Sequence, residues 1–113
     1  MPEEKPSWLT SLKRKKFFNE TIARGSFIRD IKKIKDTDTK VAILKSIEDV
    51  ENAKSISDIP NIKSLTGYKG YYRIKPLPNK EYRIGLYFSD KMMEFVCCLK
   101  RKDIYKFFPK NYE

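Results

Sequence analysis

Histidine is absent from this chain of 113 residues, and cysteine occurs only twice. Histidine is the commonest metal ligand and the commonest general base, so its absence argues against a transition-metal site and against imidazole catalysis. The two cysteines, Cys97 and Cys98, are neighbours in the sequence. Adjacent strand residues point to opposite faces, and a disulfide between them would be strained. The sequence therefore predicts two free thiols in a reducing cytoplasm.

Long apolar runs are also missing, and neither a membrane-spanning segment nor a secretory signal peptide is recognisable. What the chain has in excess is positive charge, with 25 Lys and Arg against 15 Asp and Glu and a net charge of +10. Residues 63–113 hold 12 of the Lys and Arg but only 5 of the Asp and Glu. This excess predicts a polyanionic partner, either nucleic acid or an acidic protein, with a membrane surface least favoured.

The hydrophobic pattern changes its period along the chain. Residues 17–23 have the aromatic and β-branched content of a strand. Apolar residues then recur at helical spacing from Ser26 to Ile34 and from Val41 to about Lys54, which predicts a helical hairpin. Three further strands are expected at about 71–76, 82–88 and 93–99. The order predicts an α+β fold, with a helical hairpin packed on a mostly antiparallel four-stranded sheet (β-α-α-β-β-β).

Strand alternation places cations together on one face of this sheet. Arg73 and Lys75 share a face with Tyr71, and Arg83 has the same relation to Tyr87 in the next strand. The apolar residues of both strands point the other way. The last expected strand is apolar on both faces, which predicts a central strand or one covered on both sides. One half of the sheet is thus expected to be buried and the other half to meet an anion.

Five segments carry a family resemblance: Ser26–Ile34, Ile59–Ile62, Leu65–Lys75, Tyr82–Gly85 and Arg101–Tyr105. Together they resemble the RelE/ParE superfamily of toxins from bacterial type II toxin–antitoxin pairs. The similarity extends from about Ser26 to Pro109. It implies a single toxin domain over residues 17–113, preceded by an extension of residues 1–16. It also implies a cytoplasmic protein held inactive by a cognate antitoxin.

The activity implied by the resemblance depends on the branch of the superfamily. RelE-type toxins cleave messenger RNA, commonly in the ribosomal A site, whereas ParE-type toxins act on DNA gyrase and are not nucleases. The site residues of active RelE-type members correspond here to Arg73, Lys75, Arg83, Arg101 and Tyr105. The resemblance therefore favours a metal-independent endoribonuclease that acts on ribosome-bound messenger RNA and needs no cofactor.

RNA supplies its own nucleophile, the 2′-hydroxyl, so such an enzyme needs a base, a proton donor and cations around the phosphate. Arg83 is the first choice for gripping the phosphate, because its planar fork matches phosphate oxygens. Arg73, Lys75 and Arg101 would add positive potential around the phosphate. Tyr105 is the candidate base, since nearby cations favour its phenolate.

The proton donor is expected to be Lys75 or Lys100, because arginine does not readily release a proton. Many RelE-type members have histidine at the position of Lys100. Additional contacts with RNA are expected from the remaining cations and one aromatic ring of this region: Lys69, Tyr71, Lys100 and Lys102.

Several alternatives stay open at this level. Cations on a strand face are often solvated residues that protect a sheet edge, and Tyr71 and Tyr105 could be packing residues. The chain could be a ParE-like gyrase inhibitor, or an inactive relative that only binds RNA or antitoxin. In each case an acidic antitoxin is expected to cover the cationic patch as a strand or a helix, giving a toxin–antitoxin hetero-oligomer.

Overall fold

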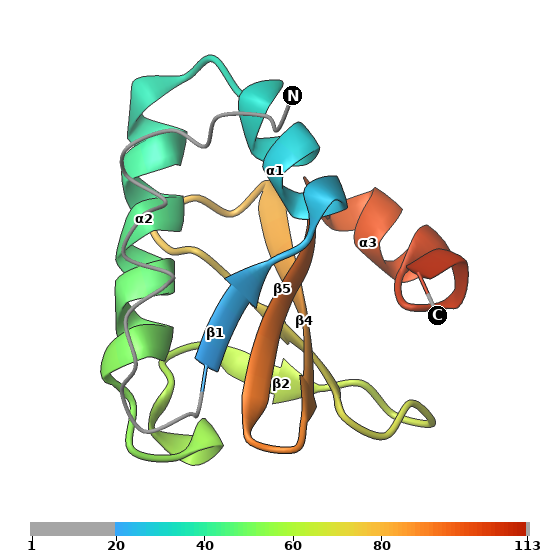
Figure 1. Cartoon of the computed structure of the whole chain (residues 1–113). Helices are drawn as coiled ribbons and strands as arrows, with labels where there is room; N and C mark the ends of the chain where they lie inside the picture. Colours follow the sequence, from blue (N-terminus) through green and yellow to red (C-terminus); the bar gives the residue numbers. More distant parts are fainter. Residues whose placement is uncertain (1–19, 113) are drawn as a thin grey trace, which may run out of the picture.

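The computed structural model describes residues 20–112 (Figure 1). The helices and strands are β1 (Glu20–Ala23), α1 (Gly25–Lys32), α2 (Thr37–Asn52), β2 (Ile62–Ser64), β3 (Tyr71–Ile74), β4 (Tyr82–Ser89), β5 (Met92–Lys100) and α3 (Arg101–Phe107), with short 3-10 turns η2 (Ile56–Asp58) and η3 (Lys110–Tyr112). One five-stranded sheet has the order β1-β5-β4-β3-β2, in which only β1 and β5 pair in parallel. The predicted α+β class with a mostly antiparallel sheet is confirmed.

Two elements were not predicted, the strand β2 and the helix α3, so the expected count of four strands was too low. β2 has only three residues, which is too short for an alternating pattern to be visible. β3 ends at Ile74 rather than at 76, because Pro76 has no N–H to give to a ladder. The predicted extension and residues 17–19 of the first expected strand lie outside the described residues.

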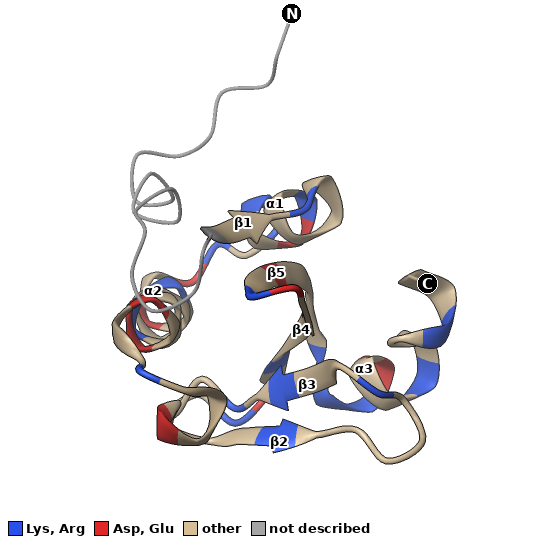
Figure 2. Ribbon diagram, turned by 60° about the horizontal axis from the view of Figure 1, so that its bottom comes forward, with Lys and Arg blue, Asp and Glu red and all other residues tan. Residues whose placement is uncertain are grey.

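The sheet is covered on both faces, and Figure 2 shows α2 and α3 on its opposite sides. The larger core lies between the sheet and the first two helices, and includes Phe27, Ile31, Ile43, Ile47, Ile84, Leu86 and Phe95. The smaller core lies under α3 and the residues that follow it, and consists of Val96, Cys97, Ile104 and Phe108. None of the helices within residues 20–112 has the length and the apolar content that crossing a bilayer requires.

β5 lies between β1 and β4 and is buried from Phe95 to Cys98, which confirms the prediction of a strand covered on both sides. Both cysteines are free and buried, and burial raises the pKa of each thiol above its ordinary value. The ladder shifts its register next to Gly85, which pairs with Cys97 while Leu86 pairs with Phe95. This bulge places two successive β5 residues, Val96 and Cys97, in the core under α3.

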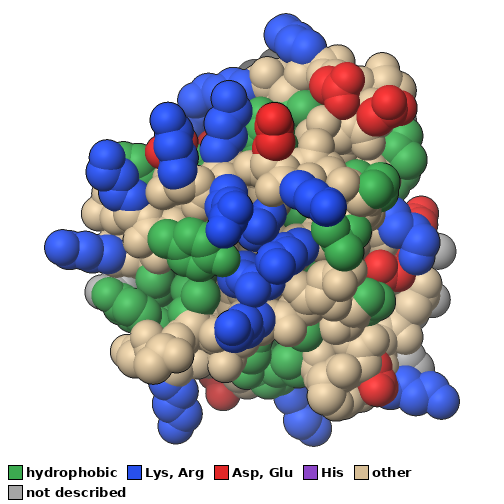
Figure 3. Space-filling model, turned by 180° about the vertical axis from the view of Figure 1, so that it is seen from behind, with side chains coloured by type: hydrophobic (Ala, Val, Ile, Leu, Met, Phe, Trp, Pro, Cys, Tyr) green, Lys and Arg blue, Asp and Glu red, His purple; other side chains and the backbone are tan. Residues whose placement is uncertain are grey.

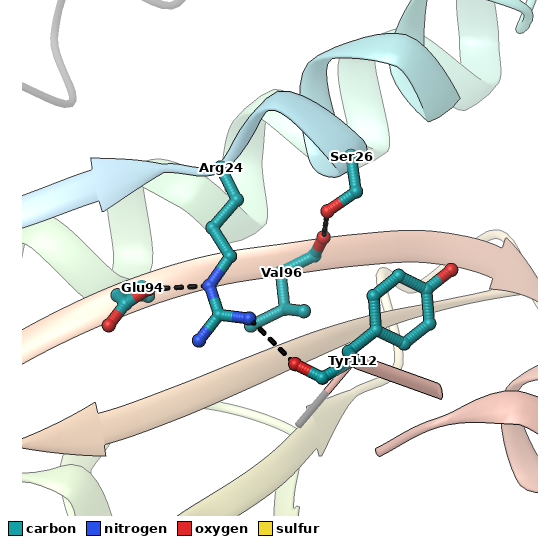
Figure 4. Close-up of polar contacts among 5 residues, drawn as sticks. All are labelled: Arg24, Ser26, Glu94, Val96 and Tyr112. Carbon is teal, nitrogen blue, oxygen red and sulfur yellow. Dashed lines mark hydrogen bonds and ion pairs between the residues drawn. The ribbon is translucent and has the colours of Figure 1, made fainter. Parts of the chain in front are cut away.

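α1 continues along the edge of β5 where β1 stops (Figure 4). Ser26 Oγ donates a hydrogen bond to the Val96 carbonyl, and Asp30 accepts one from the Cys98 N–H at 2.9 Å. Arg24 pairs through Nε with Glu94 and donates to the Tyr112 carbonyl at 3.1 Å. These contacts satisfy polar groups at the edge of β5 and attach the C-terminal segment, and hence the region of α3, to the sheet.

Candidate functional site

Three cations lie on neighbouring strands, on the face of the sheet that α3 covers. Lys63 of β2 is directly opposite Arg73 of β3, and Arg73 is opposite Gly85 of β4. Arg83 precedes Gly85 by two residues and therefore points to the same side. Figure 2 shows basic positions on β2, β3 and α3 around this region. Because like charges across a strand pair repel, an anion bound here would relieve the repulsion.

Tyr105 of α3 lies over two of these cations, Arg73 and Arg83. Its hydroxyl accepts a hydrogen bond from Arg73 Nε at 3.0 Å, and the Arg73 guanidinium also donates to the Asn61 carbonyl at 3.4 Å. The preceding residue, Ile104, is buried and docks the helix on the sheet, while Tyr105 remains 55% exposed. The helix thus leaves the tyrosine at the rim of the site, with its oxygen on the arginine and its ring accessible from outside.

The charge environment of Tyr105 favours its ionised form. Partial burial raises the pKa of the phenol. Arg83 and Arg73 lower it by more, both through hydrogen bonds to the phenol oxygen and through their positive charge. The pKa of Tyr105 consequently lies below its ordinary value. This direction is the one expected for a tyrosine that acts as a general base, because a larger fraction of it is phenolate near neutral pH.

Arg83 is more deeply buried than an exposed phosphate ligand would be, with only 4% of the residue accessible. One terminal nitrogen donates to the main-chain carbonyls of Lys80 at 3.0 Å and Tyr82 at 2.8 Å. Its Nε has no hydrogen-bond partner among the described residues. The guanidinium therefore lies in the floor of the site, beneath Tyr105, and its predicted grip on a phosphate stays a prediction.

Two hollows border Tyr105. One, of ≈ 320 Å³, lies between β2, the β2–β3 loop and the end of α3, and includes Lys63 and Arg73 in its lining. The other, of ≈ 460 Å³, is lined by Lys102 and Lys106 together with Asp103. Figure 3 shows Lys and Arg side chains gathered near the middle of one face of the molecule, with hydrophobic side chains beside them. Among the charged residues that line the two hollows, four are cations and one is an anion, so the charge around Tyr105 is mainly positive.

The other predicted catalytic residues lie at the margin of this site. Arg101 is exposed in the first turn of α3, four residues before Tyr105, and borders a separate hollow with Lys100 and Lys102. Lys100 is the exposed N-cap residue of α3. Lys75 follows the end of β3, is half-buried and lines neither of the hollows that Tyr105 borders. The structure thus brings Arg73, Arg83 and Tyr105 together but not Lys75.

The residues predicted to contact RNA are divided in the same way. Lys102 borders the second hollow beside Tyr105, whereas Lys69 is exposed in the β2–β3 loop outside both hollows. The ring of Tyr71 is half-buried, with its centroid 4.6 Å from that of Tyr87 and 5.6 Å from that of Phe108. These contacts favour the packing alternative for Tyr71.

Sequence reasoning missed two lysines of the site, Lys63 and Lys106, which lie on the two unpredicted elements β2 and α3. The helix left a readable signal: Ile104 and Phe108 are four residues apart, and both are buried in the core under α3. The short strand β2 left none. Within residues 20–112 there is no cluster of three acidic, cysteine or histidine residues that could hold a metal ion.

The fold is shared with solved structures of toxin–antitoxin systems. In the RelB–RelE antitoxin–toxin complex from Methanococcus jannaschii, the matching chain is 31% identical, the TM-score is 0.63, and the match covers 78% of this chain and 99% of that one. YafQ from E. coli strain BL21(DE3) is 16% identical with a TM-score of 0.53, over 76% of this chain and 97% of YafQ, which supports the fold alone.

An archaeal RelE–RelB complex from Pyrococcus horikoshii OT3 gives the same TM-score of 0.53 at 13% identity, over 72% of this chain and 92% of its match. No protein-family model and no curated protein matches the chain. The identity to the M. jannaschii protein extends over almost the whole of that chain, so it supports more than a common fold. This chain belongs to the RelE-like family of toxins from toxin–antitoxin systems.

Proposed function

We propose that this toxin is a metal-independent endoribonuclease that cleaves messenger RNA. The observation that carries the proposal is the contact between Tyr105 and Arg73, 3.0 Å from oxygen to nitrogen, over the buried Arg83. This contact brings the proposed base, a tyrosine with a lowered pKa, next to cations in one accessible site. Such a pair suits a substrate that contains both a phosphate and its own nucleophile.

In the proposed reaction, Tyr105 as phenolate takes the proton of a ribose 2′-hydroxyl. The 2′-oxygen attacks the adjacent phosphorus, and the bond from phosphorus to the 5′-oxygen breaks. The products are a 2′,3′-cyclic phosphate and a 5′-hydroxyl. Arg73 and Arg83 stabilise first the phenolate and then the negative charge that develops on the phosphoryl oxygens.

The leaving 5′-oxygen needs a proton, and a lysine ammonium can give one. Lys102 and Lys106 border the same hollow as Tyr105, so they are better placed for this step than Lys75 or Lys100. Tyr105 is 55% exposed at the rim of the site. An open site of this kind suits an RNA strand that the ribosome already holds. We therefore propose that the substrate is messenger RNA on the ribosome, in the cytoplasm.

The test compares RNA ends after expression of the wild-type chain and of two variants, Tyr105→Phe and Arg73→Gln. Each variant removes one partner of the central contact, and each is expected to lower the cleavage rate by about 10²–10³-fold, as for other preorganised groups. Tyr112→Phe is the matched control. It also removes a tyrosine hydroxyl, but burial raises the pKa of Tyr112 to about 12, so this hydroxyl is not suited to act as a base.

Cleavage at the wild-type rate in both site variants would refute the assignment of the site. An end map with no new RNA ends for the wild type, together with loss of DNA supercoiling by gyrase in vitro, would assign the chain to the gyrase-inhibiting class instead. Binding of RNA with neither effect would identify an inactive relative.

An acidic antitoxin is the protein partner that we propose. The solved structures of M. jannaschii RelE and E. coli YafQ include complexes with the antitoxins RelB and DinJ. Here the net charge of +10 and the lysines around Tyr105 would attract a segment rich in Asp and Glu. Covering these lysines would block the access of RNA, which explains how such a partner could hold the toxin inactive.

A further inference from the structure

The hollow between β2, the β2–β3 loop and the end of α3 contains side chains that the proposed reaction does not use. Tyr68, 38% exposed, lines this hollow together with the hydroxyl-bearing residues Ser64 and Thr66. Arg73 and Tyr105 line the same hollow. A surface with aromatic, hydroxyl and cationic groups is therefore continuous with the proposed reaction centre.

Tyr68 is supported from behind by a fixed group of rings. Its ring meets that of Tyr71 edge to face, with centroids 6.5 Å apart and an interplanar angle of 85°. Tyr71 in turn packs on Tyr87 and Phe108. Because the ring of Tyr68 does not stack on a neighbour in this contact and remains partly exposed, it can offer a planar surface to a ligand.

We propose that this hollow is a nucleobase subsite, in which a base next to the cleaved phosphodiester stacks on Tyr68. The inference rests on the proposed ribonuclease function and adds to it how the substrate is recognised. Ser64 and Thr66 supply hydroxyls that can donate to or accept from the edge of the base. Lys63, opposite Arg73 in the ladder, meets the neighbouring phosphate.

Three features favour a base over an acidic peptide as the occupant. Every base has a flat face that stacks on an aromatic ring, and stacking of unpaired bases is the usual mode of single-strand recognition. The volume of ≈ 320 Å³ is at the lower end of the range for small-ligand sites. Because Tyr105 borders this hollow as well, a phosphate at Tyr105 and a base at Tyr68 can belong to adjoining nucleotides.

The experiment measures binding without cleavage. Short single-stranded RNAs with 2′-O-methyl groups cannot supply the nucleophile, so their affinity reports recognition alone. They are compared with oligonucleotides of the same length that are abasic throughout. The wild type is expected to bind the base-containing strand about tenfold more tightly than the abasic one, as one stacked base contributes on this scale.

Tyr68→Ala is expected to lose this preference while keeping its affinity for the abasic strand, and Tyr68→Phe, which keeps the ring, to retain it. Lys63→Ala should weaken the binding of both strands equally. Phe107→Ala is the matched control, because Phe107 is also 38% exposed but does not line this hollow. An unchanged melting temperature for Tyr68→Ala confirms that the variant is folded.

A base preference that survives in Tyr68→Ala, or its absence in the wild type, would overturn the subsite. An effect of Tyr68→Ala on the affinity for an acidic peptide, with none on the affinity for RNA, would assign the hollow to a protein partner and overturn it too. The proposed nuclease function is tested separately, by mapping RNA ends. A wild type that shows the Tyr68-dependent preference but produces no RNA ends would keep the subsite and refute the nuclease.

Discussion

Replacement of Gly85 by alanine tests how closely the end of α3 fits the sheet. A Cβ atom at this position would lie 2.8 Å from Cys97 Sγ and 2.8 Å from Phe108 Cζ. Real Cβ atoms essentially never approach other heavy atoms so closely, so the Phe108 ring or β5 has to move. Both neighbours are buried, and neither can turn away into solvent. Glycine is therefore required at position 85, because the space beside it is too small for a Cβ atom.

Overpacking a filled core in this way costs about 1–3 kcal/mol. For a domain of this size the melting temperature changes by about 4 °C per kcal/mol, so a decrease of about 4–12 °C is expected in thermal unfolding followed by circular dichroism. Tyr105 lies on the last turn before Phe108. A shift of Phe108 should therefore disturb the contact between Tyr105 and Arg73 and lower the rate of RNA cleavage as well.

Two variants sharpen this experiment. Adding Phe108→Leu to Gly85→Ala removes the ring atoms that the new Cβ would meet, so the double variant should lose less stability than the two single losses together. Gly25→Ala is the matched control, because its Cβ would meet only Arg29 at an ordinary 3.5 Å. A melting temperature unchanged in Gly85→Ala would show that the end of α3 is not packed against β4, and the reasoning would fail.

Other predictions concern the site and the second helix. If Tyr105 is the base, the cleavage rate should rise with pH up to its lowered pKa, and Arg73→Gln should move this rise to higher pH; a profile unmoved by the substitution would exclude the role. The affinity for single-stranded RNA should fall with added salt, and Lys63→Ala should reduce the slope of log K against log[salt] by about 0.7. Asp36 caps α2 by accepting hydrogen bonds from the Thr39 hydroxyl at 2.7 Å and from the Thr39 N–H at 2.8 Å, and these bonds lower the pKa of its carboxyl. Asp36→Ala should lower the melting temperature at neutral pH, and this difference should shrink as the pH falls through that pKa, because protonation weakens the cap.

The alternation of β3 and β4 was sufficient to place Arg73 and Arg83 on one face of the sheet, because side-chain direction in a strand depends only on position along it. The same reasoning could not show how deep these arginines lie. Arg83 is buried because of what covers that face, and α3 had not been predicted. The contact of Arg73 with Tyr105 joins residues 32 positions apart, and it depends on the docking of Ile104.

Burying the charges of two arginines costs folding free energy unless polar or negatively charged groups around them replace their contacts with water. The hydrogen-bond acceptors described for Arg73 and Arg83 are main-chain carbonyls and the Tyr105 hydroxyl. Carbonyl oxygens satisfy the N–H groups but do not neutralise the charge. The electrostatic deficit is reduced when Tyr105 becomes a phenolate or when a phosphate approaches. In the proposed mechanism, a chain without histidine obtains its general base in this way: the two arginines in the floor of the site lower the pKa of the tyrosine at its rim.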